Sequence, residues 1–158
     1  MRRYSSGYDF LFFTAIVATL LSLAPGLAHL FELPRKISLS REQYFTVQQI
    51  YAGWELFGID ILIQAISLSM LAWRSSREYY VFRPVMAALI FMVLAQALFW
   101  LFTFPANSIT DNWTRMSADW EGLRWQWEYS HAAGAICQLL AFCCLIGALF
   151  ARVRASGR

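Results

Sequence analysis

Charged residues are scarce in this chain of 158 residues: 15% are Asp, Glu, Lys or Arg, whereas 59% are hydrophobic. A soluble domain of this length has enough surface to need more charge, so the deficit excludes an ordinary soluble fold. It predicts instead that lipid covers much of the outside. Nucleic-acid binding is excluded as well, because it needs a basic face on a soluble fold.

Cysteine and histidine are also rare. Cys137, Cys143 and Cys144 all lie within one apolar segment. Residues at those spacings on a single helix cannot join distant parts of the chain, so a disulfide framework is excluded and we expect packing roles. Only two histidines, His29 and His131, are present, and this limits how a metal could be held.

Four apolar runs are long enough to cross a membrane. A hydrocarbon core of about 30 Å takes roughly 20 helical residues. The runs cover residues 10–30, 45–73, 85–104 and 125–152. They use up the chain, so the sequence predicts an all-α integral membrane bundle of four transmembrane helices in a single domain, 1–158. A transporter is disfavoured, because it would be expected to show broken helices in two related halves.

The arginines predict the orientation of this bundle. One side of the membrane carries most of them, whereas the other side carries most of the carboxylates. By the positive-inside rule, both termini and the turn between the second and third helices face the cytoplasm. We therefore expect a multi-pass protein of the inner (plasma) membrane. The arginines on the cytoplasmic side are Arg2, Arg3, Arg74, Arg77, Arg83, Arg152, Arg154 and Arg158.

Local signals mark some of the helix ends. Pro25 and Gly26 predict a kink in the first helix, and Pro34 predicts its end. Ser40 followed by Gln43 resembles a capping box, which predicts that the second helix begins just after Ser40.

The second run has an unusual polar load for a membrane segment. Two ionisable groups in apolar surroundings cost several kcal/mol unless they are paired, protonated or hydrated. This load predicts a helix inside the bundle, with polar groups that face its neighbours. The polar residues are Gln48, Gln49, Glu55, Asp60 and Gln64.

The segment 104–135 and the residues opposite it hold most of the remaining polar chemistry. In the fourth helix, Glu128 and His131 are three residues apart and share a face; in the first helix, His29 and Glu32 have the same spacing in reverse order. The two helices run in opposite directions. The reversed order therefore places both pairs at one depth, where they can face each other.

Three interpretations of these facing pairs stay open. The first is a non-haem metal site, since Glu-x-x-His pairs hold iron or manganese in some four-helix carboxylate proteins. Its ligands would be His29, Glu32, Glu128 and His131. The second is a haem held between His29 and His131. The third is that each His and Glu only satisfies its neighbour near the membrane interface.

Arg124 lies beside Glu121 and Glu128 on the acidic side. A bidentate guanidinium–carboxylate pair there would fix the turn into the fourth helix. The same guanidinium would also hold an anionic or enolic ligand. Tryptophans at the ends of membrane spans usually form an interfacial belt, and we favour that role over ligand stacking for three of them. These three are Trp113, Trp120 and Trp125.

One stretch resembles a known family. It contains Phe104-Pro105-Ala106-Asn107, then Trp113, Trp120, Leu123-Arg124 and Trp127-Glu128-Tyr129-Ser130-His131-Ala132. These residues resemble the anthrone oxygenase-like family of small four-helix membrane proteins. The likeness covers residues 104–135 and is only architectural elsewhere.

The resemblance implies an oxygenase that acts on polycyclic phenolic anthrones, as in fungal members, or a role that is mostly unassigned, as in bacterial ones. It implies that His131 is a general base, after which the electron-rich carbanion reacts with oxygen. The implied pocket residues are Asn107, Trp120, Arg124, Trp127 and His131. Many relatives place an Arg soon after this His, whereas Ala132-Ala133-Gly134 follow it here, so the resemblance does not name the substrate.

We therefore predict a polar, aromatic-lined pocket that opens outward. The expected catalytic residues are His131, Glu128 and Arg124, and the expected substrate-binding residues are Asn107, Trp113, Trp120, Trp127 and Glu55. The expected function is oxygenase-like or redox chemistry, cofactor-free or metal-dependent, on a lipophilic aromatic or quinone-like small molecule. The alternative is a non-catalytic accessory subunit of a larger membrane complex that holds haem, pigment or quinone. Expected partners are membrane lipid, the lipophilic small molecule, and a membrane-protein partner or a second copy.

Overall fold

A computed structural model describes residues 6–156, and these form helices with no strand among them. Four segments are long and apolar enough to cross a membrane: Ser6–Lys36, Trp54–Ser75, Tyr79–Thr110 and Trp120–Ala155. The prediction of an all-α bundle with four spanning helices is confirmed, and the protein is a multi-pass membrane protein. Arg2, Arg3 and Arg158, which carry part of the topology prediction, lie outside the described residues.

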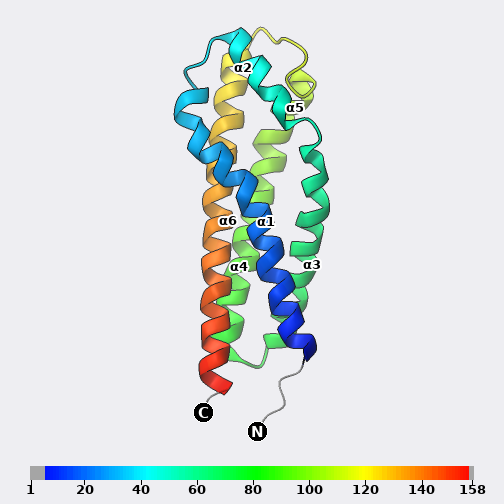
Figure 1. Ribbon diagram of the computed structural model, residues 1–158, viewed down its shortest axis with the longest axis vertical. Coiled ribbons are helices and arrows are strands. Elements are labelled where there is room, and N and C mark those ends of the chain that lie inside the picture. Colours follow the sequence, from blue (N-terminus) through cyan, green and yellow to red (C-terminus); the bar gives the residue numbers. More distant parts are fainter. Residues whose placement is uncertain (1–5, 157–158) are drawn as a thin grey trace.

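The long helices run alternately up and down the bundle (Figure 1). They are α1 (Ser6–Lys36), α3 (Phe57–Ser75), α4 (Tyr79–Leu98) and α6 (Trp120–Ser156). Two short helices, α2 (Arg41–Gln48) and α5 (Phe104–Thr110), lie at the upper end in Figure 1. We call this the distal end. The start of α1 and the end of α6 lie together at the opposite, proximal end.

The proximal half is held together by apolar side chains. Small residues let the helices approach closely, which is how membrane helices gain packing contacts where lipid is as apolar as the core. The buried members are Tyr8, Phe12, Ala15, Leu68, Leu71, Ala72, Val81, Val85, Ala88, Met92, Ala141, Leu145 and Ala148.

Towards the middle of the bundle, polar side chains link three helices. Gln64 of α3 is fully buried; its Nε2 donates to Oε1 of Gln138 at 2.8 Å and to Oγ1 of Thr19 at 3.2 Å. Nearby, the Ser22 hydroxyl donates to Asp60 at 2.7 Å. The polar load of the second apolar run therefore faces neighbouring helices at Gln64 and Asp60, as predicted.

The first helix is longer than predicted. α1 passes through both Pro25 and Pro34 and ends at Lys36. Proline is tolerated in membrane helices where neighbouring groups satisfy the freed backbone. At Gly26 the helix lies so close to α6 that a Cβ would be 3.2 Å from that of Ala135. The extra turn beyond Pro34 brings Lys36 into the bundle, where it is 3% exposed.

The second predicted helix, residues 45–73, is broken. α2 ends at Gln48 and α3 begins at Phe57. Two 3-10 turns join them, Gln49–Tyr51 and Trp54–Leu56. The break occurs at Gly53, whose φ of +90° is the left-handed region that glycine adopts without a steric cost. Glu55 follows this break and is exposed, and its place in the pocket stays a prediction.

The predicted capping box before α2 is confirmed. The Ser40 hydroxyl accepts from the Gln43 backbone N–H at 3.4 Å, and Oε1 of Gln43 accepts from the Ser40 N–H at 3.1 Å. This cap starts α2 across the distal end of the bundle and brings Tyr44 against Glu128 of α6.

The third and fourth helices also exceed their predicted bounds of 85–104 and 125–152. α4 begins at Tyr79, passes into a π-helical turn at Phe99–Thr103 and continues as α5. In this turn the Thr103 hydroxyl lies 2.7 Å from the Ser130 hydroxyl. α6 begins at Trp120, so one more turn of it lines the distal end.

Candidate functional site

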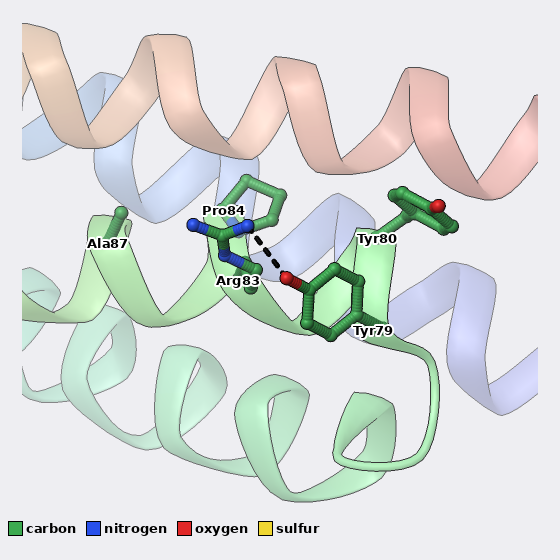
Figure 2. Close-up of a pocket in the computed structure, with 5 residues that line it drawn as sticks. All are labelled: Tyr79, Tyr80, Arg83, Pro84 and Ala87. Carbon is green, nitrogen blue, oxygen red and sulfur yellow. Dashed lines mark hydrogen bonds between the residues drawn. The ribbon is translucent and has the colours of Figure 1, made fainter.

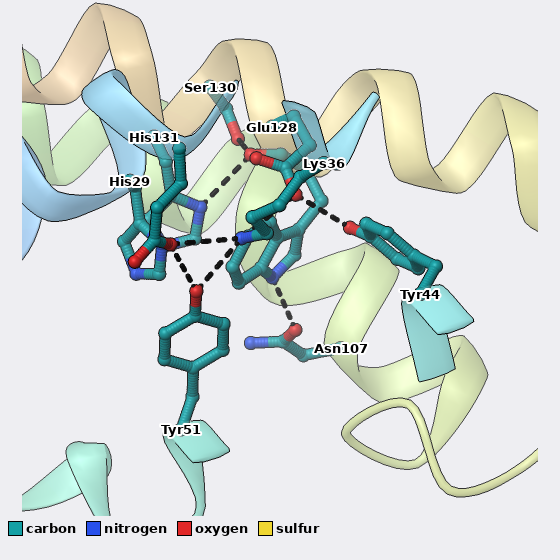
Figure 3. Close-up of polar contacts among 10 residues, drawn as sticks. His29, Lys36, Tyr44, Tyr51, Asn107, Glu128, Ser130 and His131 are labelled. Atoms are coloured by element: carbon teal, nitrogen blue, oxygen red, sulfur yellow. Dashed lines mark hydrogen bonds and ion pairs between the residues drawn. The ribbon is translucent and has the colours of Figure 1, made fainter. Parts of the chain in front are cut away.

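Polar and aromatic side chains from α1, α2, the following 3-10 turn, α5 and α6 meet at the distal end (Figure 3). They form one network of hydrogen bonds, ion pairs and ring contacts. We call the set the distal cluster: His29, Glu32, Lys36, Tyr44, Tyr51, Asn107, Trp127, Glu128 and His131.

Lys36 is at the centre of the cluster. Its Nζ lies 3.0 Å from Oε1 of Glu128 and 3.7 Å from Oε2 of Glu32, and it donates to the Tyr51 hydroxyl at 3.1 Å. The ammonium also lies 4.6 Å from the ring centroids of both Tyr51 and Trp127. Burying a charge is costly unless it is paired and hydrogen-bonded. Lys36 meets this condition through two carboxylates and two aromatic faces.

Glu128 is fully buried on α6. The Tyr44 hydroxyl donates to its Oε1 at 3.0 Å, whereas its Oε2 has no hydrogen-bond partner among residues 6–156. Burial, followed by the neighbouring Glu128 charge, raises the pKa of Tyr44 well above its ordinary value. Tyr44 therefore stays protonated and donates to the carboxylate.

Glu32 connects the cluster to the surface. The Tyr51 hydroxyl donates to its Oε2, and burial together with this carboxylate raises the pKa of Tyr51. The Glu32 side chain is 39% exposed, whereas those of Lys36 and Glu128 are 4% and 0% exposed. Among the three charged members, Glu32 is therefore the one that can exchange a proton directly with the surroundings.

The two histidines lie side by side between α1 and α6. Their ring centroids are 4.4 Å apart, and the His131 ring lies 3.9 Å from that of Trp127. The two His–Glu pairs are predicted to face each other, and the structure shows this for their imidazole rings. Nδ1 of His131 lies 3.0 Å from the Trp127 carbonyl oxygen. Since a carbonyl only accepts, Nδ1 of the neutral ring carries the hydrogen and Nε2 keeps its lone pair.

The residues expected to bind a metal or haem do not fit either group. Within the described chain, no cluster of three or more His, Cys, Asp or Glu side chains can hold a metal ion. Lys36, a cation, lies between Glu32 and Glu128 instead. The imidazoles of His29 and His131 are in ring contact, which leaves no gap for a macrocycle between them.

Arg124 does not make the predicted pair with Glu121 or Glu128. Its Nη1 donates to the Leu39 carbonyl at 2.8 Å, and its guanidinium lies 4.6 Å from the Trp120 ring centroid. The physical reason is that Glu128 is paired with Lys36, while Glu121 is exposed. Arg124 itself is 7% exposed.

The other predicted pocket residues have structural contacts. Oδ1 of Asn107 accepts from the Trp127 indole N–H at 2.7 Å, which joins α5 to α6. Trp113 is 2% exposed and packs edge-on against Tyr44, with centroids 4.9 Å apart, so it is a core residue and not part of an interfacial belt. Its φ of +63° is unusual for a bulky residue. Trp120 is partly buried against the same core.

Three members of the distal cluster were not predicted from the sequence: Lys36, Tyr44 and Tyr51. Lys36 follows Glu32 at the i,i+4 spacing of a helical ion pair, which was a usable signal, but Pro34 placed Lys36 in a loop. Tyr44 and Tyr51 had no local signal. Their place depends on how α2 and the turn after it fold over α6.

A hollow at the proximal end has a different character (Figure 2). It is lined by Tyr79, Tyr80, Arg83, Pro84 and Ala87. Nη1 of Arg83 donates to the Tyr79 hydroxyl at 2.9 Å, and both tyrosines are exposed. Tyrosine and arginine in this setting are typical of a membrane–water boundary, so this hollow is separate from the distal cluster.

Comparison with known proteins assigns no family. No protein-family model matches the chain, and neither a characterised protein nor a solved structure is found to be similar to it. The resemblance to the anthrone oxygenase-like family therefore rests on residues 104–135 alone.

Proposed function

We propose that the protein is a small membrane enzyme that removes a proton from a lipophilic phenol or enol, in oxygenase-like or redox chemistry. The observation that carries this proposal is the state of His131. Its Nδ1–H is held by the Trp127 carbonyl, and its Nε2 has no protein partner among the described residues. A general base needs a lone pair in a fixed position, and Nε2 offers one. His131 as a whole is intermediate in exposure, and the proposal requires that a ligand reach Nε2.

A positive charge close to this base supports the proposal. The Lys36 ammonium lies over the ring of Trp127, and His131 contacts the same ring. Removing a proton from a phenol or an activated C–H group leaves a negative charge. A fixed cation in a site of low dielectric stabilises such a charge more than water does. The resulting electron-rich anion can then pass electrons to dioxygen, which is the oxidant in this proposal.

A route for the proton also supports it. The His29 ring contacts that of His131, and Nδ1 of His29 lies 4.0 Å from Oε2 of Glu32. Nδ1 of His29 is buried without a hydrogen-bond partner in the described chain. The partly exposed Glu32 carboxylate then leads to the surface. His131 would regain its basic form by this route between turnovers.

We further propose that the proximal end faces the cytoplasm and the distal cluster the outside of an inner membrane. Arginines at the proximal end support this orientation through the positive-inside rule. Those within the described residues are Arg74, Arg77, Arg83, Arg152 and Arg154. A ligand would then reach His131 from the outer leaflet.

The test is oxygen consumption by the purified chain in lipid nanodiscs, with a phenolic anthrone or a quinol as substrate. We expect turnover by the wild type and a loss of about 100-fold or more in His131→Gln, since general-base catalysis contributes at least that much. Cys143→Ala, on an exposed position of the same helix, is the matched control and should keep full activity. Equal activity of His131→Gln and wild type would overturn the proposal. Absence of turnover together with co-purifying subunits would favour an accessory subunit.

A further inference from the structure

We infer that the distal end also holds a binding site for an anionic oxygen group, a phenolate or carboxylate, centred on Arg124. Three Lys or Arg side chains are buried in residues 6–156: Lys36, Arg124 and Arg152. Lys36 has two carboxylate partners, and Arg152 pairs with Asp9 at 2.6 Å. Arg124 alone has no carboxylate within 4.0 Å in this part of the chain.

An unpaired buried guanidinium needs an explanation. Arginine stays charged at every physiological pH, so burial cannot be relieved by loss of the proton. The Leu39 carbonyl and the Trp120 face satisfy part of the group. Nε of Arg124 remains buried with no acceptor among the described residues. A bound anion would supply both the missing acceptor and the missing charge.

Two further buried N–H donors lie around the Tyr44 side chain. Nε2 of Gln48 and Nε1 of Trp113 have no acceptor in residues 6–156. The Trp113 ring is 4.9 Å from that of Tyr44, the Arg124 guanidinium is 5.6 Å from it, and Gln48 follows Tyr44 by one turn of α2. Three of the unsatisfied groups around Tyr44 are thus N–H donors, one of them charged, and the fourth is Oε2 of Glu128, whose carboxylate is paired with Lys36. The three donors select an oxygen acceptor, and a negative one above a neutral one.

The position of this site relative to His131 suggests the shape of the ligand. Arg124 and His131 are seven residues apart on α6, which is about 10 Å along the helix. A ligand with its anionic oxygen at Arg124 would extend along α6, past Glu128, towards Nε2 of His131. This step rests on the proposed function, whereas binding of the anion at Arg124 does not. The expected substrate class is a flat aromatic acid or phenol whose acidic proton lies at the far end from its anionic oxygen.

The experiment compares a fluorescent aromatic carboxylate, 9-anthroate, with its uncharged methyl ester, by quenching of tryptophan emission in phosphatidylcholine nanodiscs. We expect the wild type to bind the carboxylate at least about tenfold more tightly than the ester, the size of one hydrogen bond to a charged group. Arg124→Gln should remove this preference, and Arg124→Lys should keep part of it. Equal wild-type affinities for the two probes would overturn the inference without any variant.

Arg115→Gln is the matched control. Arg115 is also at the distal end and also donates to a backbone carbonyl, that of Ile109 at 2.8 Å, but it is exposed. It should leave the preference for the carboxylate unchanged, and a loss as large as that in Arg124→Gln would overturn the site at Arg124. If Arg124→Gln fails to fold, Gln48→Met takes its place and should weaken carboxylate binding more than ester binding.

Two further arms identify the source of the anion and separate the two proposals. Phosphatidylglycerol in the nanodiscs competes with the probe if a lipid phosphate occupies the site, and leaves its affinity unchanged if the site prefers a small aromatic anion; both results support an anion site at Arg124. His131→Gln should lose turnover but keep the preference for the carboxylate. A wild type that turns over its substrate but binds the carboxylate and the ester equally would refute the anion site alone. A wild type that prefers the carboxylate but shows no turnover would refute the proposed function alone.

Discussion

The two ends of the bundle are held together by different interactions. At the proximal end, apolar side chains such as Leu68 and Val85 fill the core, and the buried Arg152 is paired with Asp9. At the distal end, two carboxylates, a lysine and two tyrosines share one network beside two histidines. The buried side-chain atoms without a partner in residues 6–156 are also unevenly divided. Tyr8 holds the one at the proximal end, and the distal ones are on His29, Gln48, Trp113, Arg124 and Glu128.

This difference separates stability from function. Apolar packing can be satisfied by many side chains of similar volume, so the proximal core defines the fold without a chemical requirement. Buried charges and unpartnered polar groups oppose folding and are expected where a site needs them. If this division is correct, substitutions in the two halves should have different consequences, and four comparisons test it.

The largest effect is expected from Lys36→Met. This change leaves Glu128 buried without its cation, and breaking a buried ion pair from one side costs about 3–5 kcal/mol. The double variant Lys36→Met/Glu128→Gln should regain most of that loss, because the one carboxylate left without its cation, Glu32, has a side chain that is 39% exposed and stays hydrated. Chemical unfolding in detergent micelles measures both. A single variant as stable as the wild type would show that Lys36 does not neutralise the cluster.

The next effect belongs to the proximal core. Leu68 is fully buried, and Leu68→Ala should lower the free energy of unfolding by about 2–5 kcal/mol because it leaves a cavity. Leu62 lies on the same helix but is 64% exposed, so Leu62→Ala should stay within about 0.5 kcal/mol of the wild type. The turnover of folded Leu68→Ala should equal that of the wild type. Reduced turnover would mean that the two ends are coupled.

A smaller loss of stability, with a specific loss of activity, is expected at Gly26. A Cβ there would lie 3.2 Å from that of Ala135, so Gly26→Val forces α1 and α6 apart at a cost of about 1–3 kcal/mol. It should also reduce turnover, because His29 follows one turn later. Gly134 has nothing within 4 Å of an added Cβ, and Gly134→Val should change stability by about 0.5 kcal/mol or less. Equal turnover in the two variants would show that the spacing of the histidines is unimportant.

The smallest effect is a dependence on alkaline pH. Because folding raises the pKa of Tyr44, its contribution to stability is complete below the ordinary tyrosine pKa of about 10 and is lost as the pH rises above it. Between pH 9 and 11 the wild type should therefore lose about 1.4 kcal/mol more than Tyr44→Phe. Unfolding at several pH values measures this difference. Parallel pH profiles would show that Tyr44 is not held protonated by its surroundings.

Most of the fold could be predicted because hydropathy and length determine membrane helices strongly. The capping box at Ser40 and Gln43 was also readable, since its signal is local. The break at Gly53 was not, because a glycine inside an apolar run does not reveal a positive φ. Pro34 was misleading, because the environment in a membrane bundle can satisfy the backbone that proline frees.

The candidate site could be predicted only in part. The reversed spacing of His29, Glu32, Glu128 and His131 indicated two facing pairs, because antiparallel helices convert sequence order into depth. The ion-pair partners of the charged side chains could not be predicted. Glu128 is paired with Lys36 and not with the neighbouring Arg124. This pairing depends on where α1 ends and on how α2 covers α6.

The most direct test of the central claim is proton exchange without oxygen. A phenolic anthrone is incubated anaerobically in D2O with the protein in nanodiscs, and deuterium at its acidic carbon is followed by mass spectrometry. We predict that the wild type accelerates exchange above the uncatalysed rate and that His131→Gln does not, whereas Cys143→Ala behaves as the wild type. Exchange at the same rate with His131→Gln as with the wild type, or no acceleration by the wild type, would contradict the assignment of the distal cluster as a proton-abstracting site.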